Sequence, residues 1–283
     1  MSAGWVAARA GARRGWIELK HSFTTPGDLA TLVIWTAVLL GVMVLMRTTT
    51  VPGTRFSLGT TMMASMVGMN VGFNGLATMG GMLTVEREDG TLLRAKATPH
   101  GMTGYLIGKV VTVSGTILIS VITSLAVGVF LFSGLALGSA ATWLTLAWVI
   151  VLGLVATLPI GAVLGSLFPS ARSAGLLTLA VSGMVAISGI FYPITHLPAW
   201  LQWLGQVFPM YWLGLGMRSA LLPATMASVE IGHSWRHLAT FGVLGAWAVT
   251  GLVLAPVLLR RMARRESGSV VAARREKAMA RAT

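Results

Sequence analysis

Long stretches without a charged residue alternate with short polar segments along this chain. A helix needs about 20 mostly apolar residues to cross a bilayer, and the pattern predicts six such helices: residues 29–46, 58–84, 110–132, 143–168, 174–192 and 238–259. The third and fourth belong to one uncharged run, which we divide at the small, turn-forming residues 133–139. Pro169 and Pro193 end the fourth and fifth helices, because proline interrupts the helical hydrogen bonds.

Residues 193–222 are also apolar, but we do not interpret them as a seventh span. Pro198 and Pro209 divide the segment into pieces too short to cross a bilayer. Its aromatic residues suit the level of the lipid headgroups: Trp200, Trp203, Tyr211 and Trp212. The segment is therefore predicted to form two short helices that enter the outer leaflet and return as a re-entrant hairpin.

The first 25 residues have the pattern of an amphipathic helix. On a helical wheel Trp5, Ala12, Trp16, Leu19 and Phe23 share one face, and Arg9, Arg13 and Lys20 lie beside it. This predicts a helix that lies in the inner membrane interface. A plain basic anchor that sets the orientation of the first span is the alternative. Residues 26–260 then form the membrane domain, and residues 261–283 form a basic tail to which we assign no role.

The composition places the chain in a membrane. Only 10% of its 283 residues are charged and 55% are hydrophobic, whereas soluble domains carry roughly 25% charged residues. A chain with so little polar surface must expose apolar side chains to lipid, which excludes a soluble enzyme. The chain has no cysteine, so disulfides and thiolate metal sites are excluded as well.

The net charge of +13 reflects membrane topology rather than nucleic-acid binding. With a cytoplasmic amino terminus, the predicted outer side holds only four basic residues: Arg47, Arg55, Arg218 and Arg236. Because basic residues favour the cytoplasmic side, both termini are predicted to be cytoplasmic in a multi-pass protein of a bacterial-type cell membrane.

The segment between the second and third predicted spans holds three of the chain's eight acidic residues. Residues 86–97 begin with acids and end with bases, which suits the dipole of a short helix, and Pro99 follows its end. Such a helix, joined rigidly to two membrane helices, can transmit force from a docked partner. An ordinary solvated loop remains the alternative.

Two blocks of sequence resemble a known family. Glu86-Arg87-Glu88-x-Gly90-Thr91-Leu92, followed by Thr98-Pro99 and Tyr105-Leu106-x-Gly108-Lys109, is similar to the coupling-helix motif of type-2 ABC transporter permeases, the group that includes daunorubicin-resistance-like exporters. Ser188-Gly189-Ile190-Phe191-Tyr192-Pro193, then Leu197-Pro198-x-Trp200-Leu201-Gln202, Phe208-Pro209-Met210-Tyr211 and Arg218, resembles the end of that family's fifth span and its outer hairpin. The resemblance covers nearly the whole chain and implies an all-α fold with six spans.

The resemblance also implies partners. It implies that a separate ABC ATPase subunit, which binds ATP and Mg²⁺, docks on this chain. It also implies that the chain pairs with a second permease chain, identical or homologous, so that the complex holds two copies of the ATPase. The implied docking residues are Glu86, Arg87, Glu88, Asp89, Gly90, Thr91 and Leu92, with Arg172 as a minor contact. No G-x-x-x-x-G-K-[ST] string occurs in the chain, so we expect no ATP site, catalytic residue, cofactor or metal in the chain itself.

The second predicted span carries the candidates for a substrate pathway. Met62 and Met66 lie on one helical face, and the thioether side chain adapts to varied apolar molecules. Asn70 and Asn74 share a face that ought to avoid lipid. Phe191 and Tyr192, at the end of the fifth span, complete the candidate set. The alternatives are packing of the methionines against span five or a second protomer, and interhelical hydrogen bonds for the asparagines.

Charged residues are absent from the predicted membrane core, so an ion-coupled transporter lacks its usual acid. This favours an ATP-driven exporter that moves an apolar or amphipathic cargo (a drug, a lipid or a lipid-linked molecule) outward by alternating access. A polysaccharide or glycolipid exporter, a non-transporting scaffold and a membrane enzyme remain alternatives. Glu230 and His233 are expected to be solvated loop residues.

Overall fold

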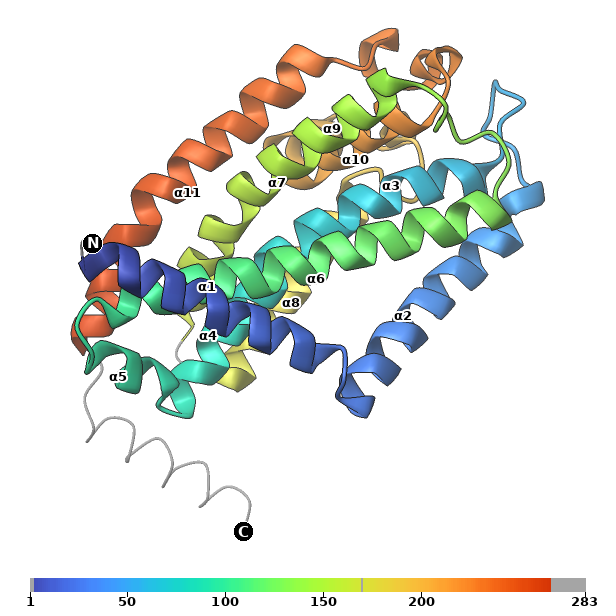
Figure 1. The fold of residues 1–283 in the computed structure, drawn as a ribbon. Helices are drawn as coiled ribbons and strands as arrows, with labels where there is room; N and C mark the ends of the chain where they lie inside the picture. The colour runs from blue at the N-terminus through green and yellow to red at the C-terminus, as the bar shows by residue number, and fades with distance from the viewer. Residues whose placement is uncertain (1–2, 169, 266–283) are drawn as a thin grey trace.

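The structure is a computed structural model that describes residues 3–168 and 170–265, and these form a bundle of α-helices (Figure 1). The helices are α1 (Ala3–Ser22), α2 (Pro26–Leu45), α3 (Leu58–Phe73), α4 (Met79–Glu88), α5 (Thr91–Lys96), α6 (Gly101–Leu131), α7 (Ala140–Leu167), α8 (Ala171–Ile187), α9 (Ala199–Val207), α10 (Pro209–Leu221) and α11 (His237–Arg265). A π-helical turn, Asn74–Thr78, joins α3 to α4. In the described ranges the only β-type pairing is an isolated bridge between Thr50 and Ser57.

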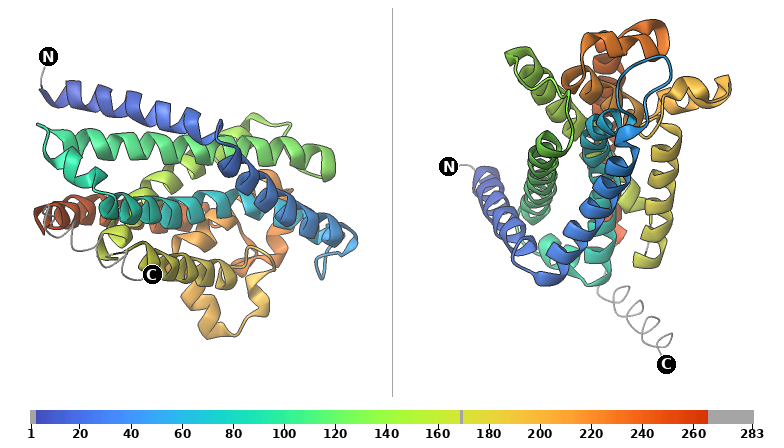
Figure 2. Two further views of the ribbon diagram at one scale, coloured as in Figure 1. Left: turned by 90° about the horizontal axis from the view of Figure 1, so that it is seen from below. Right: turned by 90° about the vertical axis from the view of Figure 1, so that its right-hand side faces the viewer.

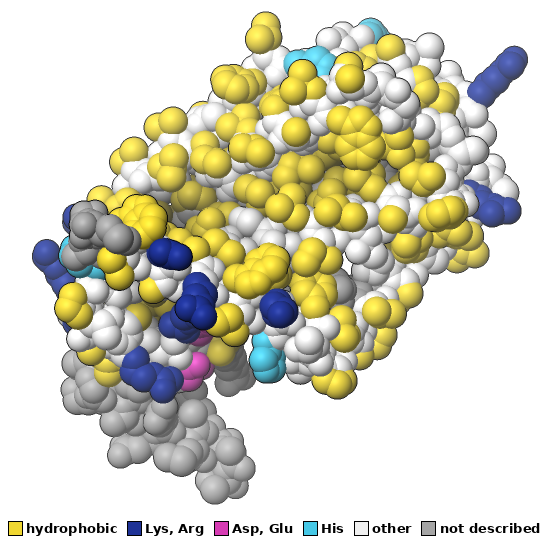
Figure 3. All heavy atoms as spheres, viewed as in Figure 1, with side chains coloured by type: hydrophobic (Ala, Val, Ile, Leu, Met, Phe, Trp, Pro, Cys, Tyr) yellow, Lys and Arg dark blue, Asp and Glu magenta, His cyan; other side chains and the backbone are white. Residues whose placement is uncertain are grey.

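Several helices have the length and the apolar surface that membrane-spanning helices need. Among the described residues, three helices are long and apolar enough to cross a bilayer, Gly101–Leu131, Ala140–Leu167 and His237–Arg264, and two shorter apolar helices are Thr36–Thr48 and Ala174–Ile187. Apolar side chains cover the flank of the bundle, and many of the charges on the face shown in Figure 3 gather at the end near α5. The predicted all-α integral membrane class is therefore confirmed.

The core forms where α7 crosses the middle of the bundle. This helix packs against α3, α4, α10 and α11, and α10 packs in turn against α3. Val67, Val149, Leu213 and Leu244 from these helices are fully buried in one apolar cluster. The two further views in Figure 2 show the same bundle, with α2 leaning away from its centre.

The amino-terminal residues form the expected helix, and α1 lies along α6 (Figures 1 and 2). The contact uses glycines on both helices: a Cβ atom at Gly11 would lie 2.1 Å from the Gly104 carbonyl oxygen, and one at Gly15 would lie 2.2 Å from that of Gly108. Small residues four positions apart allow such close backbone approach. Leu19 is buried against α6, so only part of the predicted apolar face, including Trp5 and Trp16, stays exposed.

The predicted helix over residues 86–97 has different bounds in the structure. Residues 86–88 continue α4, and the separate short helix α5 begins only at Thr91. Gly90 separates the two helices in the left-handed region, with φ at 81°, a conformation that glycine adopts without steric cost. The Asp89 Oδ1 atom accepts a hydrogen bond of 2.8 Å from the Thr91 backbone N–H, which satisfies one of the free N–H groups at the start of α5. The chain therefore turns a corner, which we call the α4–α5 corner (residues 86–96).

Residues 193–222 contain two short helices, α9 and α10, and Pro209 is the first residue of α10. Trp200 and Trp203 on α9 are 66% and 74% exposed, and α9 projects from the bundle (Figure 2). Tyr211 and Trp212 are 0% and 2% exposed. These two aromatic side chains therefore pack inside the protein rather than facing the lipid headgroups, because α10 packs between α3 and α7.

Candidate functional site

A cavity of about 900 Å³ lies between α2, α3, α6 and α8, near the end of α1. Its lining includes five of the six residues that the sequence predicts for a substrate pathway: Met66, Asn70, Asn74, Phe191 and Tyr192. Met62 is the exception. It is 5% exposed and packs behind the cavity wall in an apolar cluster with Met43, Met63 and Met66. The cavity therefore brings together residues from two segments that are more than a hundred positions apart in sequence.

The cavity wall is apolar with uncharged polar groups. Met66, Met69, Phe73 and Phe191 supply the larger apolar side chains. Hydroxyl and amide groups come from Ser22, Thr36, Asn70, Asn74, Thr116, Ser120, Ser182 and Tyr192. Among the described residues that line it, none is Asp, Glu, Lys, Arg or His. Such a wall accommodates an uncharged amphiphilic molecule, whereas a charged one would lose its hydration without gaining an ion pair.

The two asparagines of the wall are held by their own helix. Asn70 Nδ2 donates to the Met66 carbonyl at 3.2 Å, and Asn74 Nδ2 donates to the Asn70 carbonyl at 3.0 Å. Thr78 Oγ1 donates to Asn74 Oδ1 at 3.0 Å. These bonds fix the side chains along one face of α3 and the π-helical turn. The interhelical bonds predicted as an alternative do not occur for either amide among the described residues.

The π-helical turn at the cavity packs closely against α7. A Cβ atom at Gly75 would lie 2.0 Å from Thr157 Oγ1, and one at Gly161 would lie 2.2 Å from the Gly75 carbonyl oxygen. The turn and α7 are thus in backbone contact. Helical structure continues from Leu58 through the π-helical turn to Glu88, so one rod connects the cavity wall to the α4–α5 corner.

The α4–α5 corner presents fewer of the predicted docking residues than expected. Glu86 has a side chain only 17% exposed and forms an ion pair with Lys109 of α6. Leu92 is 1% exposed and lies in the main core, so it anchors α5 to its own chain. The burial of Leu92 corrects the prediction that it packs against a partner, whereas the half-buried Glu86 is engaged by Lys109 of its own chain. Arg87 donates to the Ser166 carbonyl of α7 at 3.4 Å, which also directs it toward its own chain.

The remaining residues of the predicted set stay near the surface or define the turn. Asp89 is exposed, Glu88 and Thr91 are half-buried, and Gly90 is buried in the turn. The side chain of Arg172 lies outside the described part of the structure. Glu88, Asp89 and Thr91 are thus the members of the set that a partner could contact directly.

A buried lysine links three helices beside the corner. The Lys109 side chain is 7% exposed; its Nζ atom donates to Glu18 Oε2 of α1 at 2.6 Å and also pairs with Glu86 of α4. Thr112 Oγ1 lies 3.3 Å from the same Glu18 oxygen. We call Glu18, Glu86 and Lys109 the charge triad. Sequence reasoning placed Lys109 in a motif without a role; the signal it offered was a lone cation at the edge of a long uncharged run.

The two carboxylates of the charge triad lie in different electrostatic environments. Burial opposes ionisation of Glu18, but hydrogen bonds and charge from Lys109 and Arg14 outweigh it and hold the pKa of Glu18 below its ordinary value. Arg14 Nε lies 2.9 Å from Glu18 Oε1. The Tyr105 ring lies 6.0 Å from Lys109 Nζ, within the range of a cation–π contact. Within the described residues, Glu86 Oε2 and the Tyr105 hydroxyl are buried without a hydrogen-bond partner.

A second buried ion pair lies at the opposite end of the bundle, and sequence reasoning missed it. Glu230 is 6% exposed rather than solvated, which corrects the prediction for this residue. Its carboxylate accepts two hydrogen bonds from Arg218 of α10: Nε to Oε1 at 2.6 Å and Nη2 to Oε2 at 3.2 Å. Arg218 Nη1 also donates to Ser65 Oγ of α3 at 2.9 Å and to the Gly189 carbonyl at 3.3 Å. The Arg218 guanidinium thus connects α10 with α3, with the turn after α8 and with the segment before α11.

Comparison with known proteins gives a family match. The ABC-2 type transporter family model matches residues 18–222, a range that includes the cavity wall, the α4–α5 corner and the charge triad. No curated protein matches the chain significantly. Because the match covers well over half of the described helices, the chain belongs to the ABC-2 type transporter family, as a membrane permease subunit of an ABC transporter.

Proposed function

We propose that this chain is the permease of an ATP-driven exporter for an uncharged amphiphilic cargo, and the observation that carries the proposal is a cavity whose described lining residues carry no charge. Its volume of about 900 Å³ falls within the usual range of pockets for small molecules, about 300–1,000 Å³. Met66 and Phe191 supply apolar contact area, and Asn70 supplies a fixed polar group for a hydroxyl or carbonyl of the cargo.

The proposed drive comes from ATPase subunits that dock on the α4–α5 corner. Two such subunits would bind ATP and Mg²⁺, and a second permease chain, identical or homologous, would complete the pathway. The helical rod from Leu58 to Glu88 supports this mechanism, because a tilt imposed at the corner moves the asparagines of the cavity wall. Docking would then shift the population from an inward-open to a closed state and release the cargo outward.

The proposed setting is a bacterial-type cell membrane with both termini in the cytoplasm. The basic residues of the amino-terminal helix and of the α4–α5 corner support this orientation through the positive-inside rule. The segment between α2 and α3, which contains Arg47 and Arg55, then lies outside, at the end of the bundle away from α5 (Figure 1).

Replacing Asn70 with leucine is expected to weaken cargo binding about tenfold, because a buried polar group of the cargo loses its partner. The measurement is the cargo concentration that half-maximally stimulates ATP hydrolysis by the reconstituted complex, with a neutral amphiphilic dye as cargo. The matched control is Met62→Leu, which replaces a buried methionine by a residue of similar volume. Met62 lies beside the cavity but outside its lining. An unchanged half-maximal concentration for Asn70→Leu would contradict the cavity assignment.

Reversing the charge of Glu88 is expected to uncouple the complex without unfolding the chain. Glu88→Arg should lower cargo-stimulated ATP hydrolysis about tenfold, because an interfacial like-charge contact costs binding energy, while membrane insertion stays normal. Arg55→Glu is the control, since it reverses one exposed charge at the opposite end of the bundle. Coupling would have to be assigned to another segment if Glu88→Arg and Arg55→Glu behaved alike.

A further inference from the structure

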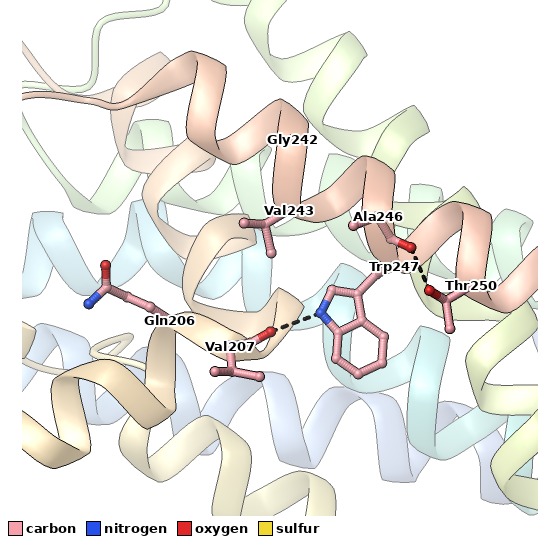
Figure 4. Close-up of a pocket in the computed structure, with 7 residues that line it drawn as sticks. All are labelled: Gln206, Val207, Gly242, Val243, Ala246, Trp247 and Thr250. Carbon is pink, nitrogen blue, oxygen red and sulfur yellow. Dashed lines mark hydrogen bonds between the residues drawn. The ribbon is translucent and has the colours of Figure 1, made fainter.

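A second hollow lies on the flank of the bundle, away from the substrate cavity. This groove, of about 350 Å³, runs between the end of α9 and the first half of α11. Figure 4 shows Val207 on one side, and Val243, Ala246 and Trp247 on the other. Trp247 Nε1 donates to the Val207 carbonyl at 2.9 Å and fixes the indole ring in the groove wall. The groove is therefore apolar and has at least one rigid aromatic wall.

The guanidinium of Arg236 lies at one end of the groove, beside Gln206. Arg236 directly precedes α11 and has a left-handed backbone, with φ at 47°. Val243 and Trp247, four residues apart, lie on one side of α11. Arg236 Nη1 donates to Gln206 Oε1 at 2.7 Å, and Gln206 itself lines the groove. The guanidinium also lies 4.8 Å from the ring centre of Trp212. This bond to Gln206 uses one of the five N–H donors of a guanidinium.

The spacing of the cation and the groove matches one leaflet of a bilayer. Trp247 lies ten residues after His237, the first residue of α11, which is about 15 Å along the helix, and half of the hydrocarbon core is about 15 Å thick. Neighbouring side chains on α11 are strongly exposed: Leu238 by 90%, Phe241 by 61% and Val249 by 62%. This flank has the exposed apolar surface of a helix facing lipid, and Arg236 stands at its polar end.

We propose that this groove is a binding site for one glycerophospholipid of the leaflet away from α5. An acyl chain lies against Val243, Ala246 and Trp247, and the lipid phosphate accepts hydrogen bonds from Arg236. Charge complementarity selects this occupant: an apolar groove alone would accept any hydrocarbon, but a fixed guanidinium at headgroup depth selects a phosphate. The bound lipid would fill the space between α9 and α11 and hold the two helices together.

The test separates the phosphate from the acyl chain. Dioleoyl phosphatidylglycerol and dioleoylglycerol have the same chains, but only the first has a phosphate. Each is titrated against the full chain in mild detergent, and native mass spectrometry counts the bound lipids. The parent chain is expected to bind phosphatidylglycerol about fivefold more tightly than dioleoylglycerol, since one basic residue near a membrane surface contributes about this factor.

Substitutions of Arg236 and of Gly242 should act differently. Arg236→Gln should remove the preference for phosphatidylglycerol, and Arg236→Lys should restore most of it. Gly242→Leu should weaken binding of both lipids, because a Cβ atom at this groove residue meets nothing within 4 Å and the leucine side chain would fill the space. Arg55→Gln, which removes an exposed arginine from the same end of the bundle, is the control and should change neither.

The proposal would be overturned by two results. One is equal preference for phosphatidylglycerol in Arg236→Gln and Arg55→Gln. The other is a change in the oligomeric state of Gly242→Leu with unchanged lipid counts, which would assign the groove to a second copy of the chain.

Discussion

Lys109→Met is expected to destabilise the chain by about 3 kcal/mol or more, because it leaves Glu18 and Glu86 without their shared cation in a buried site. A loss of this size should lower the thermal unfolding midpoint of the detergent-solubilised protein by about 8 °C. The measurement is the midpoint of tryptophan fluorescence against temperature, for parent and variant in the same detergent.

Two further variants make this prediction specific. The triple variant Lys109→Met, Glu18→Gln, Glu86→Gln should regain most of the lost stability, since neutral amides replace the two carboxylates that have lost Lys109. Lys20→Met removes an exposed lysine from α1 and should change stability by less than about 0.5 kcal/mol. A midpoint for Lys109→Met equal to that of Lys20→Met would mean that the charge triad does not stabilise the fold.

The triad should also matter for transport, because it lies between the corner and the cavity. Glu86 belongs to the end of α4, and Lys109 shares a face of α6 with Thr116 and Ser120, which line the cavity. Glu18 adds α1 to the same unit. A movement of the α4–α5 corner would then shift α1, α4 and α6 together. The triple variant tests this idea: it should be stable but less tightly coupled than the parent.

The membrane class and the cavity residues could be predicted from the sequence because both depend on local chemistry. A long uncharged run has few stable environments other than lipid or a protein core. Asn70 and Asn74 stood out because amides in an apolar helix must avoid lipid, and they do line the cavity. Phe191 and Tyr192 were included in the candidate set as residues at the end of the fifth span, and they line the same cavity.

Features that depend on long-range packing could not be predicted in the same way. Hydropathy does not distinguish a lipid-facing helix from a buried one, so Tyr211 and Trp212 were assigned to the membrane surface although α10 packs in the core. The close contact between Gly11 and Gly104 requires knowledge of which helices meet. Glu230 was expected in solvent, because nothing in the neighbouring sequence points to a partner twelve residues earlier on another helix.

Breaking the ion pair between Arg218 and Glu230 is the second change for which we expect a large loss of stability. Arg218→Met should destabilise the chain by about 3–5 kcal/mol, since it leaves the buried Glu230 carboxylate unpaired and breaks the bonds to Ser65 and Gly189. We expect little folded protein in the membrane fraction, measured by size-exclusion chromatography of a fluorescently tagged chain. Arg47→Met, which removes an exposed arginine, should give a parental profile.

A compensating change separates the unpaired charge from the other bonds of Arg218. In Arg218→Met with Glu230→Leu, the buried charge is gone, so folding should recover while α10 still lacks its bonds to Ser65 and the Gly189 carbonyl. If the bidentate pair is the dominant interaction, the double variant should be more stable than Arg218→Met alone, because apolar pairs often replace buried ion pairs without loss. If both variants are equally unstable, the bonds from Nη1 to α3 and to the turn after α8 must hold this end of the bundle together instead.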